Sequence, residues 1–158
     1  MTDEGLQPEQ REAKELVARR GLFNFPEMTD DEVVDLCEIV NTASYDSGKG
    51  GNLYGPLVND LTDLAETVPD KAERVLSSLA THKNDYAREM GAWLAGTVAK
   101  YNYPLARDIL LVLEFDEVMP EAAEAASMVT HRLATQLPAE QASDLKARRT
   151  HLKEQRGY

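Results

Sequence analysis

The chain has 158 residues, of which 42% are hydrophobic and 28% are charged, and its formal net charge is −11. This length is typical of one soluble domain that buries about two thirds of the surface its unfolded chain would expose. The acidic balance disfavours binding to free nucleic acid and to anionic membranes, because phosphate groups require a cationic surface. It favours a basic protein partner, or else it serves solubility alone.

The charge is unevenly distributed along the chain. Residues 145–158 hold five Lys or Arg against one acid, a net charge of +4 that leaves −15 on residues 1–144. A basic last helix at residues 138–156 would allow a homodimer in which this helix binds the acidic body of a second copy. The simpler alternative is a solvated helix whose cations stabilise the negative end of its own dipole.

Three observations predict a cytoplasmic protein. The first ten residues, MTDEGLQPEQ, lack the basic and apolar regions of a secretory signal. The longest run of large aliphatic residues, Ile109–Leu113, is far too short to span a bilayer, so no membrane contact is expected. Cys37 is the only cysteine, which excludes an internal disulfide and a cysteine metal cluster.

Helical periodicity begins near the N-terminus. Residues 8–21 start with a proline, carry acids early and arginines late, and end on a glycine, as helices do. Residues 29–44 form the next predicted helix, with a capping box from Thr29 to Glu32. Cys37 belongs to the apolar stripe of this helix, so we interpret it as a small core residue rather than a reactive thiol.

Glycines gather around a lysine in the stretch SYDSGKGGNLYGP, residues 44–56. A phosphate-binding P-loop requires a Ser or Thr after the lysine and a strand before it, and this stretch has neither. We therefore predict a flexible joint, and we expect the next helix to begin at Gly55-Pro56. A weaker alternative is an anion site built from backbone N–H groups. Both hypotheses concern the same residues, which are Lys49, Gly50, Gly51 and Asn52.

Prolines and polar caps divide the rest of the chain into amphipathic helices. The joints between them are so short that neighbouring helices must run antiparallel, and no segment shows strand alternation. The sequence thus predicts about eight helices in a single all-α domain, residues 1–158, built of stacked antiparallel hairpins as a short α-solenoid or a helical bundle. The expected segments here are residues 56–68, 69–82, 84–101, 104–117, 120–136 and 138–156.

An internal repeat supports this architecture. Residues 72–79 match the apolar positions of residues 106–113 at an offset of 34, and residues 87–98 match residues 122–133 at an offset of 35. Small residues line one flank of the second helix in each pair, which lets another helix approach closely.

The segment NDYAREMGAWLAGTV resembles the second helix of a HEAT repeat, and the resemblance extends over residues 70–136. The next hairpin departs from the pattern, because Pro120 and Ala123 stand where the Asp and Arg are expected. The resemblance implies an α-solenoid of a kind that usually binds proteins and more rarely nucleic acid. The residues that carry it are Asp85, Arg88, Ala92, Leu94 and Gly96.

Residue types that perform catalysis or bind metals form no recognisable motif. His82, His131 and His151 are far apart and lack metal-ligand spacing, and no nucleophile motif is present. We therefore predict no catalytic residue, no metal and no cofactor.

Carboxylates gather around the stretch EFDEVMPEAAE and on the helix at residues 84–101. We interpret them as a partner-binding surface; the alternatives are a solvated face, an acid–base pair or a divalent-cation site. Tyrosines at helix ends give a further sign of an interface, namely Tyr45, Tyr54, Tyr101 and Tyr103. The predicted partner-binding residues are Asp85, Glu89, Glu114, Asp116, Glu117, Glu121 and Glu124.

The sequence therefore predicts a non-enzymatic protein-binding module. One concrete form is a small acidic inhibitor or immunity-type protein that occludes the cationic active site of a basic partner. The first alternative is a HEAT-like DNA-acting enzyme or nucleic-acid binder, which needs a basic concave face. The second is a self-associating structural protein.

Overall fold

The computed structural model of the protein describes residues 23–46 and 51–157. Within these residues there is no strand, which confirms the all-α prediction. The helix expected at residues 8–21 lies outside the described residues. The elements, in chain order, are the 3-10 helix η1 (Phe25–Glu27) and the α-helices α2 (Asp30–Asp46), α3 (Gly51–Thr67), α4 (Pro69–Ala80), α5 (Asp85–Val98), α6 (Tyr103–Glu114), α7 (Pro120–Gln136) and α8 (Ala139–Gln155).

Local sequence signals set where most helices begin. Pro69 and Pro120 occupy the first positions of α4 and α7, where a missing N–H costs no hydrogen bond. Asn84 caps α5 by accepting a hydrogen bond from the backbone N–H two residues further on, at 2.8 Å. Thr29 and Glu32 form the predicted capping box, in which each side chain accepts from the other's backbone N–H, at 3.1 and 3.0 Å.

One helix begins earlier than predicted. α3 starts at Gly51 rather than at Gly55-Pro56, so Pro56 lies inside the helix. Pro56 is the sixth residue of this helix, so it removes the one backbone hydrogen bond that its own N–H would have donated. Of the four predicted joint residues, Lys49 and Gly50 lie outside the described residues, whereas the backbone of Gly51 and Asn52 belongs to the first turn of α3.

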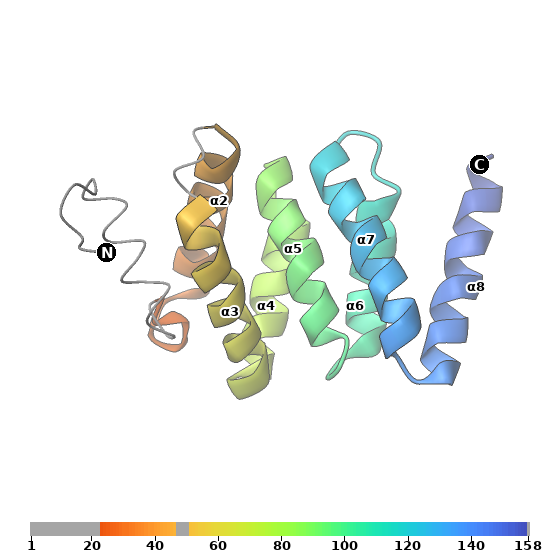
Figure 1. Cartoon of the computed structure of the whole chain (residues 1–158), viewed down its shortest axis with the longest axis horizontal. Helices are drawn as coiled ribbons and strands as arrows, with labels where there is room; N and C mark the ends of the chain where they lie inside the picture. Colours follow the sequence, from red (N-terminus) through yellow and green to blue (C-terminus); the bar gives the residue numbers. More distant parts are fainter. Residues whose placement is uncertain (1–22, 47–50, 158) are drawn as a thin grey trace, which may run out of the picture.

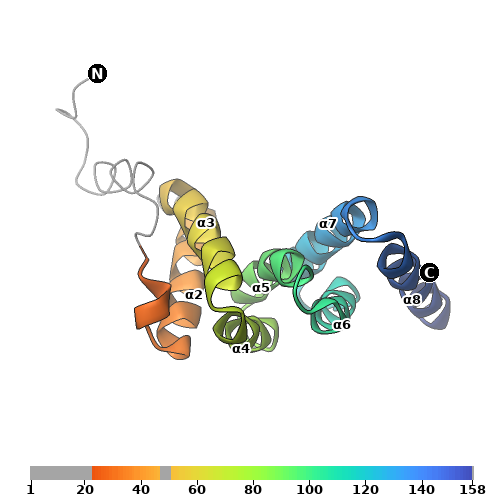
Figure 2. The ribbon, with the colours of Figure 1, turned by 90° about the horizontal axis from the view of Figure 1, so that it is seen from below.

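The helices form two layers of antiparallel hairpins. α4 pairs with α5, α6 pairs with α7, and α5 also packs along α7. Figure 1 shows α3, α5 and α7 in the front layer, with α4 and α6 behind them. In Figure 2, α3 and α7 rise on either side of α5, which makes the front layer concave, and α8 lies next to the α6–α7 hairpin at one end of the array.

The two aligned hairpins bury equivalent positions. The apolar side chains that match between residues 72–79 and 106–113, and between residues 87–98 and 122–133, are buried, except that Ile109 is partly buried. Gly96 of α5 approaches α7 so closely that an added Cβ would stand 3.0 Å from Val129 Cγ1. Cys37 is fully buried in α2, and burial raises its thiol pKa to about 12, as expected for a core residue.

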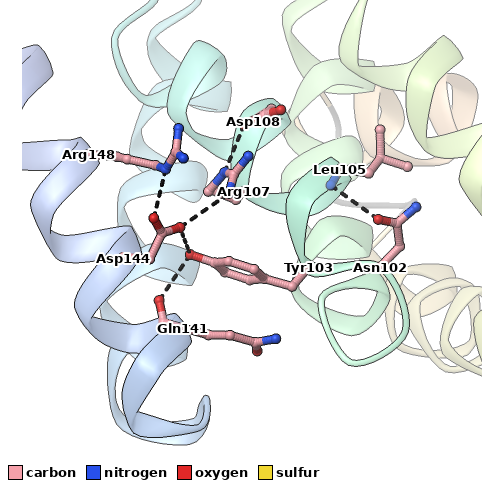
Figure 3. A network of polar contacts seen from close by, with 8 residues as sticks. All are labelled: Asn102, Tyr103, Leu105, Arg107, Asp108, Gln141, Asp144 and Arg148. Atoms are coloured by element: carbon pink, nitrogen blue, oxygen red, sulfur yellow. Dashed lines mark hydrogen bonds and ion pairs between the residues drawn. The ribbon is translucent and has the colours of Figure 1, made fainter.

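Polar contacts dock α8 onto the rest of the array. Leu145 is the one buried residue of this helix. The hydroxyl of Tyr103, at the start of α6, lies 2.8 Å from the carboxylate of Asp144 and 2.9 Å from a backbone carbonyl of α8, and these two acceptors share its one proton. Asp144 also accepts from Arg148 at 2.9 Å and from Arg107 at 3.2 Å, as Figure 3 shows. These contacts lower the pKa of Asp144, above all the hydrogen bond from Arg148.

Candidate functional site

Three of the seven predicted partner-binding carboxylates bind backbone N–H groups or arginines of another part of the molecule. Asp85, the first residue of α5, accepts hydrogen bonds from the backbone N–H groups of Glu121 and Ala122 at 3.0 and 2.9 Å, and so caps the start of α7. Asp116 accepts from Arg88 at 2.7 Å, and Glu114 pairs with Arg149 at 2.6 Å. These carboxylates have partners inside the molecule, which reduces what they can offer to another protein.

Glu89 is buried between α5 and α2 and is surrounded by neutral donors. Its carboxylate accepts hydrogen bonds from the Tyr45 hydroxyl at 2.8 Å and from Asn41 Nδ2 at 3.2 Å. Only 7% of the residue is exposed. In the described part of the chain no Lys or Arg forms an ion pair with it, and burial raises its pKa above the ordinary value of 4.5. Glu89 is therefore a group of the fold's interior rather than of its surface.

The remaining predicted carboxylates lie at the start of α7 and remain accessible. Glu117 and Glu124 are exposed, and Glu121 is partly exposed. The positions of Glu121, Glu124 and Met128 place them on one face of α7, since residues three or four apart in a helix are neighbours. We define the acidic strip as these carboxylates together with the exposed apolar residues beside them; its members are Tyr45, Glu117, Val118, Glu121, Glu124 and Met128.

The acidic strip draws on two parts of the chain that are distant in sequence. The hydroxyl of Tyr45, at the end of α2, shares its one proton between Glu89 at 2.8 Å and Glu121 at 3.2 Å, and so links α2 to the strip. Figure 1 shows the end of α2 and the start of α7 at the same edge of the molecule. Sequence reasoning named these carboxylates but not Val118 or Met128, although their exposure in a mostly polar region is what makes the strip amphipathic.

A hollow that sequence reasoning missed lies on the concave front layer. Its volume is about 540 Å³, its floor is α5 with Met90 and Trp93, and Tyr54 of α3 and Arg132 of α7 stand at its sides. A second hollow of about 190 Å³ shares Trp93 and Arg132 and extends to Lys100. We call the two together the concave groove. Its only signal in the sequence is a lone tryptophan on a helix that has small residues along one flank.

Three arginines in or directly after α8 have partners within the same molecule. Arg149 pairs with Glu114, Arg148 pairs with Asp144, and Arg156 donates to the Phe115 backbone carbonyl at 2.6 Å. Arg149 and Arg156 thus bind the acidic body of their own molecule, which the sequence predicted as the target of this helix in a second copy. Dimerisation through α8 stays a prediction.

The histidines for which contacts are seen have different partners. His82 pairs with Glu38 at 3.0 Å, whereas His131 contacts the Ser127 backbone carbonyl through Nδ1 at 2.7 Å. Among the residues that the structure describes, no three His, Cys, Asp or Glu side chains gather as a metal site would require.

Comparisons of the chain with protein-family models, with curated proteins and with solved structures found no match. In the described ranges, no helix has the length and apolar character needed to cross a membrane.

Proposed function

We propose that this protein is a non-enzymatic protein-binding module that captures a basic protein through the acidic strip. The observation that carries the proposal is that exposed apolar side chains and carboxylates occur together in the turn before α7 and on one face of α7. Val118 is 79% exposed and Met128 is 51% exposed. Interfaces commonly combine an apolar centre with a polar rim, and methionine is enriched in them.

The net charge of the chain supports a basic partner. A charge of −11 attracts a cationic protein over a distance of about one Debye length, which is about 8 Å at physiological salt. Carboxylates beside the apolar residues then set the orientation of the partner, while the apolar contacts slow its dissociation. A small inhibitor or immunity-type protein that covers a cationic active site is the specific form that this charge and size favour.

The test is affinity capture from the native lysate with a matched pair of triple variants. One variant carries Glu117→Lys, Glu121→Lys and Glu124→Lys, and the other carries Glu66→Lys, Asp70→Lys and Glu140→Lys, which are exposed acids elsewhere. Both change the net charge equally. We expect the wild type and the second variant to retain one basic protein at low salt, and the first variant to lose it.

Two outcomes contradict the proposal. Equal loss in both variants would mean that net charge alone holds the partner, and equal retention would place the contact away from the acidic strip. Circular dichroism of each variant shows whether the helices are intact, so that a loss of binding is not caused by unfolding.

A further inference from the structure

The concave groove differs in charge from the rest of this acidic protein. The chain contains 28 acidic residues, yet among the residues that the structure describes no Asp or Glu lines either of its two hollows. Of the described residues that line them, the two charged ones are the cations Arg132 and Lys100. The buried carboxylate of Glu89 acts on Tyr54 from the interior, but no described carboxylate opens onto the two hollows, so an anion meets less local repulsion there than over the acidic strip.

Arg132 is also unusual among the arginines. Residues 23–46 and 51–157 contain seven arginines, and the other six donate to a carboxylate or to a backbone carbonyl. Arg132 has no such acceptor among the described residues. Its guanidinium lies 5.8 Å from the centre of the Trp93 ring, and its side chain is exposed. Stacking on an indole holds a guanidinium in place while its N–H donors remain available.

The uncharged part of the groove suits an apolar body. Met90, Trp93 and Leu94 form its floor, and Tyr54 and Val58 form the side provided by α3. A few polar side chains, such as Asn59 and Thr97, stand among them. A volume of about 540 Å³ is within the range of small-molecule sites, which are mostly apolar with a few polar groups that fix orientation.

We propose that the concave groove is a binding site for a small amphiphilic organic acid. The apolar body of the ligand lies against the partly exposed rings of Trp93 and Tyr54, and its carboxylate or other oxyanion pairs with Arg132, whose guanidinium geometry suits two parallel hydrogen bonds. Lys100, in the second hollow, adds positive charge to the same groove. This site is separate from the acidic strip and does not depend on the proposed capture of a basic protein.

Two fluorescent probes of almost the same shape test the proposal. Anilinonaphthalene sulfonate is an apolar anion, and N-phenylnaphthylamine is its uncharged counterpart. Trp93 is the only tryptophan in the chain, so its quenching reports on the groove directly. We expect both probes to quench Trp93 and the anion to bind more tightly. Arg132→Gln should weaken the anion about tenfold or more and leave the neutral probe unchanged.

Three variants locate the binding. Thr97→Phe fills a position shared by both hollows and should abolish binding of both probes. Lys146→Gln removes an exposed cation of α8 and should change neither. The triple Lys variant of the acidic strip should also bind both probes at no less than wild-type affinity, which separates this site from the proposed protein partner.

Displacement by unlabelled molecules then tests the ligand class. Phenylbutyrate and decanoate represent aryl and acyl acids, and the matching alcohols serve as controls. Displacement of the anionic probe by either acid, at lower concentration than by its alcohol, supports the proposal. Undiminished binding of the anion to the Arg132→Gln variant, equal affinity for the two probes, or failure of both acids to displace the probe would overturn it.

Discussion

Glu89 and Glu114 show how the fold treats two buried carboxylates differently. Glu114 meets the guanidinium of Arg149, which provides a full opposite charge. Glu89 receives hydrogen bonds only from neutral groups, including the hydroxyl of Tyr45, and the nearby carboxylate of Glu121 opposes its ionisation. Burial is the largest cause of its raised pKa, and the folded state therefore holds the proton of Glu89 more tightly than the unfolded chain does.

The raised pKa of Glu89 predicts how the stability of the fold changes with pH. Above the ordinary pKa of 4.5, the folded state binds more protons at this site than the unfolded state, so the free energy of unfolding falls as pH rises through the folded pKa. Glu89→Gln removes the charge and keeps a carbonyl oxygen for Tyr45 and Asn41. We expect this variant to be more stable than the wild type near neutral pH by about 1 kcal/mol.

Urea denaturation of the Glu89→Gln variant across pH 4 to 8 measures this effect. The gain over the wild type should be largest at neutral pH and should shrink toward pH 4. Glu66→Gln, an exposed substitution of the same type, serves as the control and should give no such trend. A Glu89→Gln variant that is less stable than the wild type at neutral pH would show that the ionised carboxylate stabilises the fold.

At the scale of helices, most boundaries could be predicted because each depends on one or two residues close in sequence. Pro69, Pro120 and the cap Asn84 act locally, and the structure places helix starts where they predicted them. The start of α3 could not be predicted in the same way. Gly55-Pro56 is typical of a helix start, but Pro56 is buried within α3, where its packing outweighs one lost hydrogen bond.

The candidate site was harder to predict than the helices, because each carboxylate depends on a residue from another helix. Asp85 caps α7 through backbone groups 36 and 37 residues away, and Glu114 pairs with a residue 35 positions further on. The sequence shows that such residues are acidic but not that they have partners. The concave groove was missed for the same reason, since Trp93 and Arg132 belong to different helices.

The contact between α6 and α8 predicts that a change at Tyr103 will loosen α8 and no other helix. The Tyr103 hydroxyl bonds to two acceptors of α8, and burial raises its pKa to about 12, so it remains a donor at ordinary pH. Tyr103→Phe removes these bonds and leaves the ring in place. We expect amide hydrogen exchange in residues 139–155 to speed up about fivefold, which corresponds to a loss of about 1 kcal/mol.

Amide hydrogen exchange outside α8 shows whether the Tyr103→Phe variant loosens one helix or the whole fold. Amides of α4 and α5 should keep their wild-type rates in the Tyr103→Phe variant if the hydroxyl acts only on α8. Tyr101→Phe, at a position that is 52% exposed, should leave all rates unchanged. Uniform acceleration throughout the chain would instead show that α8 and the hairpins unfold as one unit.

For the molecule as a whole, the division of charge between an acidic body and a basic last helix has an intramolecular use. Arg149 and Arg156 attach α8 to the end of α6, where Glu114 and the Phe115 carbonyl accept their hydrogen bonds. The guanidinium of Arg156 also lies 5.6 Å from the centre of the Phe115 ring. A helix whose outer face is polar thus covers one end of the hairpin array, as the outer elements of repeat proteins generally do.

Removal of residues 139–158 tests whether α8 serves mainly as such a cover or as a dimer contact. If it is a cover, the deletion exposes apolar surface of α6 and α7 against which Leu145 was buried, and the shortened protein should self-associate at both low and high salt. The full chain should then sediment as a monomer at either salt concentration.

If α8 instead binds a second copy, the full chain should be a dimer at low salt that separates as salt screens the charges, and the deletion should yield a monomer. Analytical ultracentrifugation of both chains at two salt concentrations decides between these results, because the direction of the change in mass is opposite. The cis contacts of Arg149 and Arg156 favour the first result, since these cations already have partners within the molecule.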